Sequence, residues 1–519
     1  WRAAKGADLD ARSTATEFEA ASSRATLLGH STFDFDASYE GPICDARCPT
    51  TGESIGSTAA STLADVDDAV TRAHLAFPHW SRRPVGERAG LLKRAGDLLE
   101  ANTLELTALI AREAGRTLND GLDEVREAVD FCRYYAAQAE VLLGEVQELP
   151  GVTGETNQLR YSARGVWLCI SPWNFPLAIF VGQIAANLAV GNTVVAKPAE
   201  QTPLVARFAL HLFTQAGIES DVWSGLYGDG PNVGTPLVDD TRVRGVSFTG
   251  SHATALMINR QLARRTGPIT PFIAETGGIN CMFVDSTALP EQVIDDVINS
   301  AFRSAGQRCS ALRVLFLQRE IADKMLAILE GAMHELIVGD PRQLATDVGP
   351  VIDRRAKKTI DEHLAHLDKT ATLRAITPFD HTAYAGHFIA PQVWEINALA
   401  DLTHEIFGPV LHVIRYDTDD LSRIFSDIRA SECALTMGVH SRLRGLHERI
   451  RDEALVGNLY INRDTVGAVV GSHPFGGHGV SGTGPKAGGP NYLKRLVNEH
   501  TVTDNITALG GNTALFNLE

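Results

Sequence analysis

The chain has 519 residues, of which 44% are hydrophobic and 21% charged, as in an ordinary folded protein with a large core. It carries 47 Lys and Arg against 63 Asp and Glu, so the formal net charge is −16 with histidine counted as neutral. This acidic balance, without any cluster of basic residues, predicts that neither nucleic acid nor an anionic membrane surface is a partner. Length alone predicts two to four domains or one large enzyme.

The seven cysteines are scattered along the chain and do not form the pattern of a disulfide framework. We therefore expect a reducing compartment, the cytoplasm. Cys44 and Cys48 have no His or further Cys at ligand spacing, so we predict no metal site. The first residue is Trp1 rather than methionine, and the polar N-terminus lacks the apolar core of a secretory signal. We expect the chain to be a piece of a longer protein.

The predicted elements change in character along the chain. Residues 1–60 show weak periodicity and predict an extended lead-in with short strands. From residue 65 to 144, apolar residues recur at helical spacing, which predicts a layer of amphipathic helices. After Gly165, apolar runs at 166–170, 193–196, 245–248, 271–274 and 313–317 alternate with helical stretches at 177–190, 202–216, 253–264 and 290–305. This alternation predicts a parallel α/β sheet, whose ligands bind at the carboxyl ends of the strands.

The longest apolar stretch, 177–196, contains glutamine, asparagine and threonine, which are costly in lipid. It is predicted as a buried helix, turn and strand, and the chain is predicted to have no membrane span.

Polar residues follow three consecutive predicted strands. The turn 171–176 (SPWNFP) holds Asn174 between two prolines, where its amide could donate to a developing oxyanion. Lys197 and Glu200 (KPAE) follow the next strand, and the segment 249–251 (TGS) opens a helix whose free N–H groups could receive a phosphate. Each also has an ordinary interpretation, as a turn residue, a solvated charge or a helix N-cap.

Two further positions carry reactive side chains. Glu275 directly follows the strand 271–274, where burial can raise the pKa of a carboxyl enough for it to act as a base. Cys309 lies in GQRCS, beyond a helical stretch, where a thiol can act as a nucleophile. A lone cysteine is more often a small buried hydrophobe, but the surrounding motifs favour the nucleophile.

Seven motifs stand in the order found in the aldehyde dehydrogenase superfamily, which the chain resembles from about residue 40 to 519. They are SPWNFP, KPAE, FTGS, ETGG, GQRCS, HEIFGP (404–409) and PFGG (474–477). The resemblance implies an α/β aldehyde dehydrogenase fold with a variant Rossmann NAD-binding domain, an α/β catalytic domain and a β-flap for oligomerisation. The implied divisions are a lead-in at 1–40, an NAD-binding domain at 41–275 interrupted near 150–164 by an oligomerisation strand, a catalytic domain at 276–470, a return to the NAD-binding domain at 471–494, and the flap at 495–519.

The resemblance also implies roles for single residues. Cys309 would attack the aldehyde to form a thiohemiacetal, Asn174 and the Cys309 N–H would hold the oxyanion, and Glu275 would activate the water that hydrolyses the thioester. The implied cofactor is NAD, bound by Ser171, Pro172, Trp173, Lys197, Glu200, Gly230, Thr249, Gly250, Ser251, Glu405 and Phe407. A carboxylate at Glu200 would accept hydrogen bonds from ribose hydroxyls and repel a 2′-phosphate, which favours NAD over NADP.

The pocket motifs are most similar to those of L-glutamate γ-semialdehyde (Δ1-pyrroline-5-carboxylate) dehydrogenases, and in particular to the dehydrogenase half of bacterial proline utilisation A. This implies an amino acid semialdehyde as substrate, bound by Ser310, Gly467, Ala468, Phe175, Phe475 and Glu127. The Ser310 hydroxyl and the backbone at 467–468 could hold the α-carboxylate. Glu127 is either near the ammonium group or a solvated helix carboxylate.

Two alternatives to this function stay open at the level of sequence. The substrate could be another semialdehyde, such as succinate semialdehyde, or the chain could be a non-catalytic protein of the same fold. The segments 159–162 and 501–519, with Gly510-Gly511-Asn512, resemble the flap through which such enzymes pair, which predicts a homodimer or higher oligomer. An upstream proline dehydrogenase module is expected if the parent protein is bifunctional.

Overall fold

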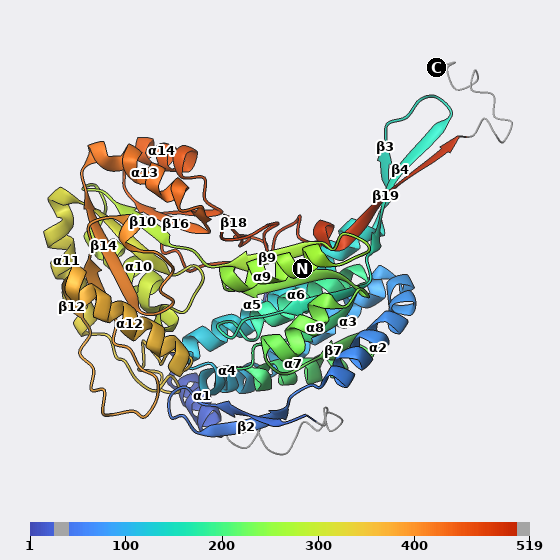
Figure 1. Cartoon of the computed structure of the whole chain (residues 1–519), viewed down its shortest axis with the longest axis horizontal. Helices are drawn as coiled ribbons and strands as arrows, with labels where there is room; N and C mark the ends of the chain where they lie inside the picture. The colour runs from blue at the N-terminus through green and yellow to red at the C-terminus, as the bar shows by residue number, and fades with distance from the viewer. Residues whose placement is uncertain (25–40, 506–519) are drawn as a thin grey trace.

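Two open sheets and a projecting flap make up the molecule (Figure 1), a computed structural model that describes residues 1–24 and 41–505. The N-terminal part contains helix α1 (Arg12–Arg24) and an antiparallel hairpin of β1 (Ile43–Arg47) and β2 (Ser54–Ala59). The short strands were predicted, but α1 was not. Phe18 of α1 packs against Leu118 and Leu122 of a later helix. Burial against residues distant in the sequence therefore stabilises α1, whose own hydrophobic periodicity is weak.

A helical layer follows, as predicted for residues 65 to 144. It consists of α2 (Leu63–Arg82), α3 (Val85–Ala101), α4 (Thr103–Glu113) and α5 (Leu118–Gly144). Thr62 and Asp65 form a capping box at the start of α2, and the Thr117 side chain accepts a hydrogen bond from the Asp120 N–H at the start of α5. These caps satisfy backbone donors that a helix start otherwise leaves unpaired.

The first sheet is wholly parallel and confirms the predicted α/β alternation. Its strands are β5 (Val166–Ile170), β6 (Thr193–Lys197), β7 (Trp223–Gly225), β8 (Val243–Gly250) and β9 (Phe272–Thr276), in the order β7-β6-β5-β8-β9. Its connecting helices are α6 (Ala178–Val190), α7 (Pro203–Gln215), α8 (Thr235–Asp239) and α9 (His252–Arg264). Gly191, in the left-handed conformation, ends α6 before β6, so 177–196 is the predicted helix, turn and strand.

Alternate residues of this sheet enter two different cores. Trp167 and Cys169 pack with α3, α5, α6 and α7, whereas Val166 and Leu168 pack with α2, α8 and α9. Helices therefore cover both faces, which explains the continuous apolar runs in the sequence. Because β5 has β6 on one side and β8 on the other, the strand order reverses between β5 and β8, where such sheets bind their ligands.

The second sheet has seven strands in the order β12-β13-β14-β11-β10-β16-β17. They are β10 (Asn280–Val284), β11 (Leu312–Gln318), β12 (Thr372–Ile376), β13 (Gln392–Glu395), β14 (Val410–Tyr416), β16 (Thr436–His440) and β17 (Asn458–Ile461), and only β12 with β13 is an antiparallel pair. Helices α10 (Pro290–Phe302), α11 (Arg319–His334), α12 (Arg354–Thr370), α13 (Leu421–Ala430) and α14 (Arg444–Ala454) belong to this part, and β15 (Cys433–Ala434) pairs with β18 (His478–Gly479). Of this sheet, the sequence predicted only the strand at 313–317.

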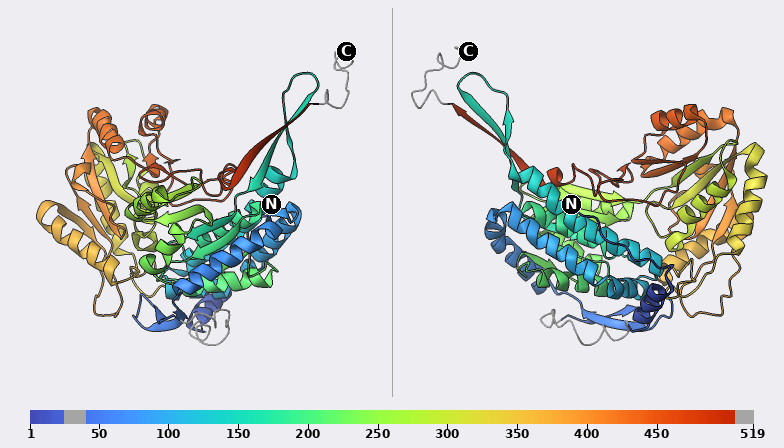
Figure 2. Two further views of the ribbon diagram at one scale, coloured as in Figure 1. Left: turned by 45° about the vertical axis from the view of Figure 1, so that its right-hand side comes forward. Right: turned by 180° about the vertical axis from the view of Figure 1, so that it is seen from behind.

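The flap is a three-stranded antiparallel sheet of β3 (Gln147–Leu149), β4 (Glu155–Ala163) and β19 (Val497–Asn505). Figure 2 shows that it stands clear of both larger sheets. The predicted segments do pair here, with Thr501 opposite Leu159, while Gly510-Gly511-Asn512 lies outside the described residues. Within 1–24 and 41–505, no helix is both long and apolar enough to cross a membrane.

Phe283 provides a test of the second core. Its fully buried ring stacks on Phe316 at 4.8 Å between centroids. We expect Phe283→Ala to lower the free energy of unfolding by about 3–5 kcal/mol, since it removes buried contacts and leaves a cavity. Ile269→Ala is the control, because Ile269 is 98% exposed. Equal urea midpoints for the two variants would contradict this packing.

Candidate active site

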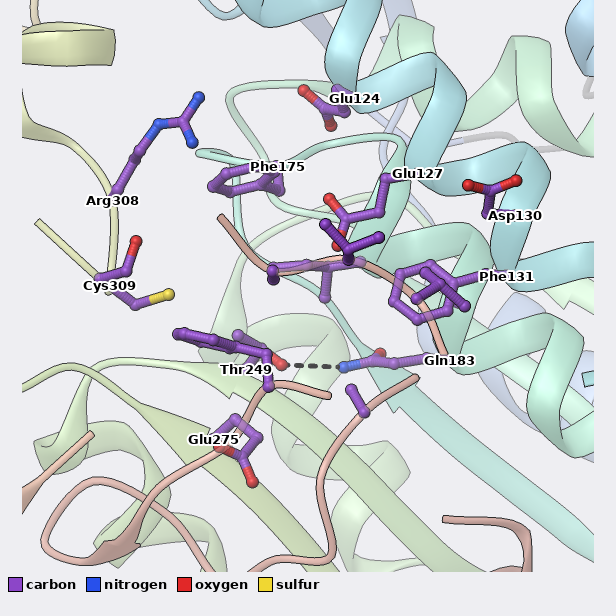
Figure 3. Close-up of a pocket in the computed structure, with 18 of the residues that line it drawn as sticks. Glu124, Glu127, Asp130, Phe131, Phe175, Gln183, Thr249, Glu275, Arg308 and Cys309 are labelled. Atoms are coloured by element: carbon purple, nitrogen blue, oxygen red, sulfur yellow. Dashed lines mark hydrogen bonds between the residues drawn. The ribbon is translucent and has the colours of Figure 1, made fainter. Parts of the chain in front are cut away.

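The ends of the first sheet's strands face a cavity of about 320 Å³, a size typical of small-molecule sites. Cys309 projects into it, Glu275 lies below Cys309, and Glu127 lies on the opposite side, on α5 (Figure 3). Thr249 and Glu275 are direct neighbours in the ladder between β8 and β9. The cavity lining also includes all six residues predicted to bind the substrate, Glu127, Phe175, Ser310, Gly467, Ala468 and Phe475.

Cys309 lies on a loop with an unusual backbone. Ser304, Ala305 and Gly306 are three consecutive residues in the left-handed conformation, with φ of 57°, 54° and 65°. Non-glycine residues in this region cost roughly 1–3 kcal/mol each and persist only where the surroundings hold them. At Gly306 a Cβ would lie 2.2 Å from the Gly408 carbonyl oxygen, so only glycine fits.

A buried charge cluster holds this loop. Asp120, at the start of α5, accepts hydrogen bonds from Arg303 Nε (2.5 Å), Ser304 Oγ (2.7 Å) and Arg308 Nη2 (2.8 Å). Burial alone would raise the pKa of Asp120, but the charges of Arg303, Arg308 and Arg116 lower it overall, so the carboxylate stays ionised. Asp120 therefore connects the helical layer to the loop that carries Cys309.

Two further side chains fix the loop from the second sheet. Asn280 Nδ2 donates to the carbonyl oxygens of Cys309 (2.7 Å) and Ala311 (2.9 Å). The fully buried Arg313 donates to the Gly306 carbonyl (2.7 Å) and forms an ion pair with Glu405 (2.9 Å). A Cβ at Gly277 would lie 1.8 Å from Glu405 Oε2, so the glycine of ETGG makes room for this carboxylate.

The predicted oxyanion donor lies beside the cysteine loop. Asn174 is nearly buried, and its Nδ2 donates to the Gln307 carbonyl at 3.1 Å. The backbone carbonyl of Asn174 accepts a hydrogen bond from Arg116. The Arg116 guanidinium also lies 4.1 Å from the Phe175 ring centroid. Glu124 pairs with Arg116 at 3.1 Å and accepts a hydrogen bond from the Leu177 N–H at 2.7 Å, at the N-terminus of α6. This chain of contacts sets the position of the turn 171–176.

Glu275 is enclosed by glycines. Its Oε2 accepts a hydrogen bond from the Gly477 N–H at 3.1 Å, and its Oε1 has no hydrogen-bond partner within the described part of the chain. A Cβ at Gly482 would lie 2.8 Å from Oε2. Burial raises the pKa of Glu275 to about 8, an effect that the Gly477 N–H and the charge of Lys486 partly offset. A carboxyl with this pKa can accept a proton near neutral pH.

The residues predicted to bind the cofactor lie outside the Cys309 cavity, except Thr249. Lys197 is buried at the end of β6, where its ammonium donates to the Pro198 carbonyl (3.2 Å) and lies 4.0 Å from the exposed Glu200. The rings of Trp173 and Phe407 meet edge to face at 5.6 Å, beside the pair of Arg313 and Glu405.

The remaining predicted cofactor residues occupy neighbouring turns. Ser251 caps α9 by accepting from the Thr254 N–H, as its ordinary interpretation requires. Gly230 begins the turn Gly230–Gly234, whose last glycine lies against the Lys197 side chain. Ser171 is buried after β5, and its Oγ has no hydrogen-bond partner among the described residues. A buried ammonium and an unpartnered hydroxyl at one sheet edge fit the polar groups of a dinucleotide.

Sequence reasoning missed the residues that hold the site together, Asp120, Asn280, Arg313, Arg116 and Glu124. All five are buried, and their partners are distant in the sequence. Only Arg313 carried a local signal, as a charge inside the apolar run 311–317, because buried charges are rare unless paired.

A protein-family model described as the aldehyde dehydrogenase family matches residues 37–502. The chain belongs to the aldehyde dehydrogenase family. It is 48% identical over 451 residues to bifunctional protein PutA of Klebsiella aerogenes, an alignment that covers 85% of this chain and 33% of PutA. The chain therefore spans about a third of the length of this relative.

Shorter members of the aldehyde dehydrogenase family match along nearly their whole length. A 1-pyrroline-5-carboxylate dehydrogenase of Geobacillus kaustophilus is 36% identical over 457 residues, which cover 87% of this chain and 88% of that protein. The solved structure of a 1-pyrroline-5-carboxylate dehydrogenase from Thermus with bound NAD superposes with a TM-score of 0.91 at 31% identity, covering 97% of this chain and 99% of the Thermus chain. These matches confirm the predicted fold.

Burial of Cys309 has a measurable consequence for its reactivity. Burial and the nearby charges of Glu405 and Glu275 raise the pKa of its thiol to about 12. The thiol is therefore protonated in the enzyme alone, and only the thiolate reacts with iodoacetamide. We expect the alkylation rate at Cys309, followed by mass spectrometry, to rise about tenfold per pH unit between pH 7 and 10. Alkylation of the exposed Cys44 in the same samples is the control for the activity of the reagent. A plateau beginning below pH 9 would contradict this environment.

Proposed function

We propose that this chain oxidises L-glutamate γ-semialdehyde, the open form of Δ1-pyrroline-5-carboxylate, to L-glutamate with NAD, the second oxidation of proline catabolism. The observation that carries the proposal is a single cavity that Cys309, Glu275 and the six predicted substrate residues line together. The names of the PutA and 1-pyrroline-5-carboxylate dehydrogenase relatives support the same substrate.

Cys309 starts the reaction. The thiol gives up its proton to solvent, the thiolate attacks the aldehyde carbon, a C–S bond forms as the C=O π bond breaks, and the oxygen of the resulting thiohemiacetal takes the negative charge. The Asn174 amide and the Cys309 backbone N–H stabilise this oxygen, because donors fixed in advance need no reorganisation as charge develops. Asp120 and Asn280 act indirectly, by holding the loop that orients the sulfur.

Glu275 completes the reaction. NAD, held by the residues around Lys197, Glu200 and Phe407, would supply the acceptor for the hydride that leaves the thiohemiacetal carbon, which would leave a thioester. Glu275 then takes a proton from water, whose oxygen attacks the thioester carbon, and the C–S bond breaks to give glutamate and the Cys309 thiol. The pKa of about 8 allows this carboxyl to take up the proton and release it again near neutral pH.

The cavity carries groups suited to both ends of an amino acid. Ser310, Gly467 and Ala468 hold the α-carboxylate with a hydroxyl and backbone N–H groups. Glu127 faces the cavity from α5 and is partly buried rather than solvated. Burial raises its pKa to about 7, and a substrate ammonium beside it would favour the ionised form.

The flap supports a proposal about assembly. Beyond Val497, almost all of β19 is exposed, and Val502 is 44% exposed although it is apolar. An exposed strand edge with apolar side chains readily pairs with another chain. We propose that the flap joins two copies of this chain in a homodimer, and that PutA-like parents carry a proline dehydrogenase module upstream.

Replacement of the nucleophile tests the function. We expect Cys309→Ala to lower NADH formation from Δ1-pyrroline-5-carboxylate by at least about a thousand-fold, while NAD binding measured by calorimetry is retained. The exposed Cys44→Ala should match the unsubstituted enzyme. Retained turnover in Cys309→Ala would exclude Cys309 as the nucleophile. A higher kcat/KM for succinate semialdehyde than for Δ1-pyrroline-5-carboxylate would mean that succinate semialdehyde is the substrate.

Glu200 tests the choice of cofactor. We expect Glu200→Gln to lower the ratio of kcat/KM with NAD to that with NADP by roughly five- to tenfold, because one exposed charge no longer repels the 2′-phosphate. Glu335→Gln, an exposed and remote carboxylate, is the matched control. An unchanged ratio in Glu200→Gln would mean that Glu200 does not lie beside the adenosine ribose of the cofactor.

A further inference from the structure

Lys486 lies in the segment that encloses Glu275. This segment returns from the second sheet and pairs with itself, because Phe475 and Ala487 exchange two backbone hydrogen bonds of 2.9 and 2.8 Å. The pairing brings the Lys486 backbone against Gly476, where a Cβ would lie 3.2 Å from Lys486 Cα and 3.2 Å from Glu275 Oε1. Lys486 and the Glu275 carboxylate are therefore on either side of one glycine.

The Lys486 side chain fixes the same segment a second time, through Asn458. Its ammonium donates to Asn458 Oδ1 at 3.0 Å and to the Gly457 carbonyl, at the start of β17. Asn458 Nδ2 donates to the Pro474 carbonyl at 3.0 Å, and Asn458 Oδ1 accepts from the Gly476 N–H at 3.4 Å. The next N–H, that of Gly477, is the donor to Glu275. Lys486, Asn458 and the turn 474–477 thus form one connected support for the base.

Glu275 is the carboxylate whose charge acts on Lys486. Within the described residues, no carboxylate lies within 4.0 Å of its ammonium, and the two acceptors that it does contact are neutral. Burial lowers the pKa of Lys486, and the charge of Glu275 raises it in return. Two other titratable groups near Glu275, Cys309 and Tyr492, have raised pKa values and are uncharged near neutral pH. Lys486 is thus the cation whose field acts on the base.

We propose that Lys486 is a positioning residue for Glu275: it fixes the Gly477 donor through Asn458, and its positive charge favours the ionised form of the base during thioester hydrolysis. The inference rests on the proposed function. It separates the two chemical steps, because Cys309 acylation does not use Glu275 and therefore does not need Lys486. A support of purely mechanical kind would not require a charge at this position.

The test uses single turnovers with enzyme in excess over Δ1-pyrroline-5-carboxylate and saturating NAD. NADH absorbance reports acylation, and free glutamate after acid quenching reports hydrolysis. In Lys486→Met we expect acylation within about twofold of the unsubstituted enzyme, while the midpoint of hydrolysis against pH moves up by about one unit, because a lost cation raises the pKa of a carboxyl. Hydrolysis at pH 7 then falls up to about tenfold and recovers at higher pH.

Further variants separate charge from geometry. Lys486→Gln keeps a hydrogen-bond donor but no charge and should shift the midpoint as Lys486→Met does, whereas Lys486→Arg keeps the charge and should stay near the unsubstituted midpoint. Lys494→Met, at an exposed lysine nearby, is the matched control. If Lys486→Met fails to fold, Lys486→Gln decides.

The outcomes are distinct. An unshifted midpoint in Lys486→Gln, or an equal loss of acylation and hydrolysis, would overturn the role of Lys486. Absence of both NADH and glutamate in the unsubstituted enzyme would instead overturn the proposed function.

Discussion

The buried cluster around Asp120 is the interaction on which the site depends. One carboxylate from the helical layer binds two guanidinium groups and one hydroxyl of the cysteine loop. Loss of one partner from such a buried group typically costs about 3–5 kcal/mol, because the remaining charges stay buried and unpaired. This is enough to hold three left-handed residues in sequence, whose strain would otherwise release the loop. The nucleophile is therefore placed by an element that lies far from it in the sequence.

The site lies between two bodies with different tasks. The first sheet provides the turn of Asn174, the Lys197 ammonium and Glu275, while the loop of Cys309 precedes a strand of the second sheet. Arg313 and Glu405 connect the cysteine loop to the segment beside Phe407 and Trp173. Nucleophile, base and cofactor edge thus meet across a boundary, where small adjustments of either body change their separations.

Sequence patterns predicted the first sheet well and the second poorly. Strands such as Val166–Ile170 are continuous apolar runs between turn residues, a signal that burial on both faces produces. Only three residues, without a helix, separate strand β10 from the end of β9, which carries Glu275, so the rule of alternating strands and helices does not find β10. Strand β12 has one buried residue and β16 contains Gly438 and His440, so neither shows an ordinary strand pattern.

The chemical residues of the site were predictable because strand ends and short motifs are local features. The residues that hold them in place were not predictable. Asp120 and Arg308 are 188 positions apart, and a contact between residues so far apart produces no periodic pattern in the sequence. The same separation affects how the protein is made. Glu275 is enclosed by Gly477 and Gly482, and β4, which already pairs with β3, gains its longer partner only with β19 at 497–505. These contacts have a high contact order, so the pocket of the base and the flap are among the last parts to form on the ribosome. A nascent chain that already contains Glu275 and Cys309 still lacks the glycine segment that buries the carboxyl and donates to it, so the base acquires its raised pKa only after the C-terminal segment has been synthesised.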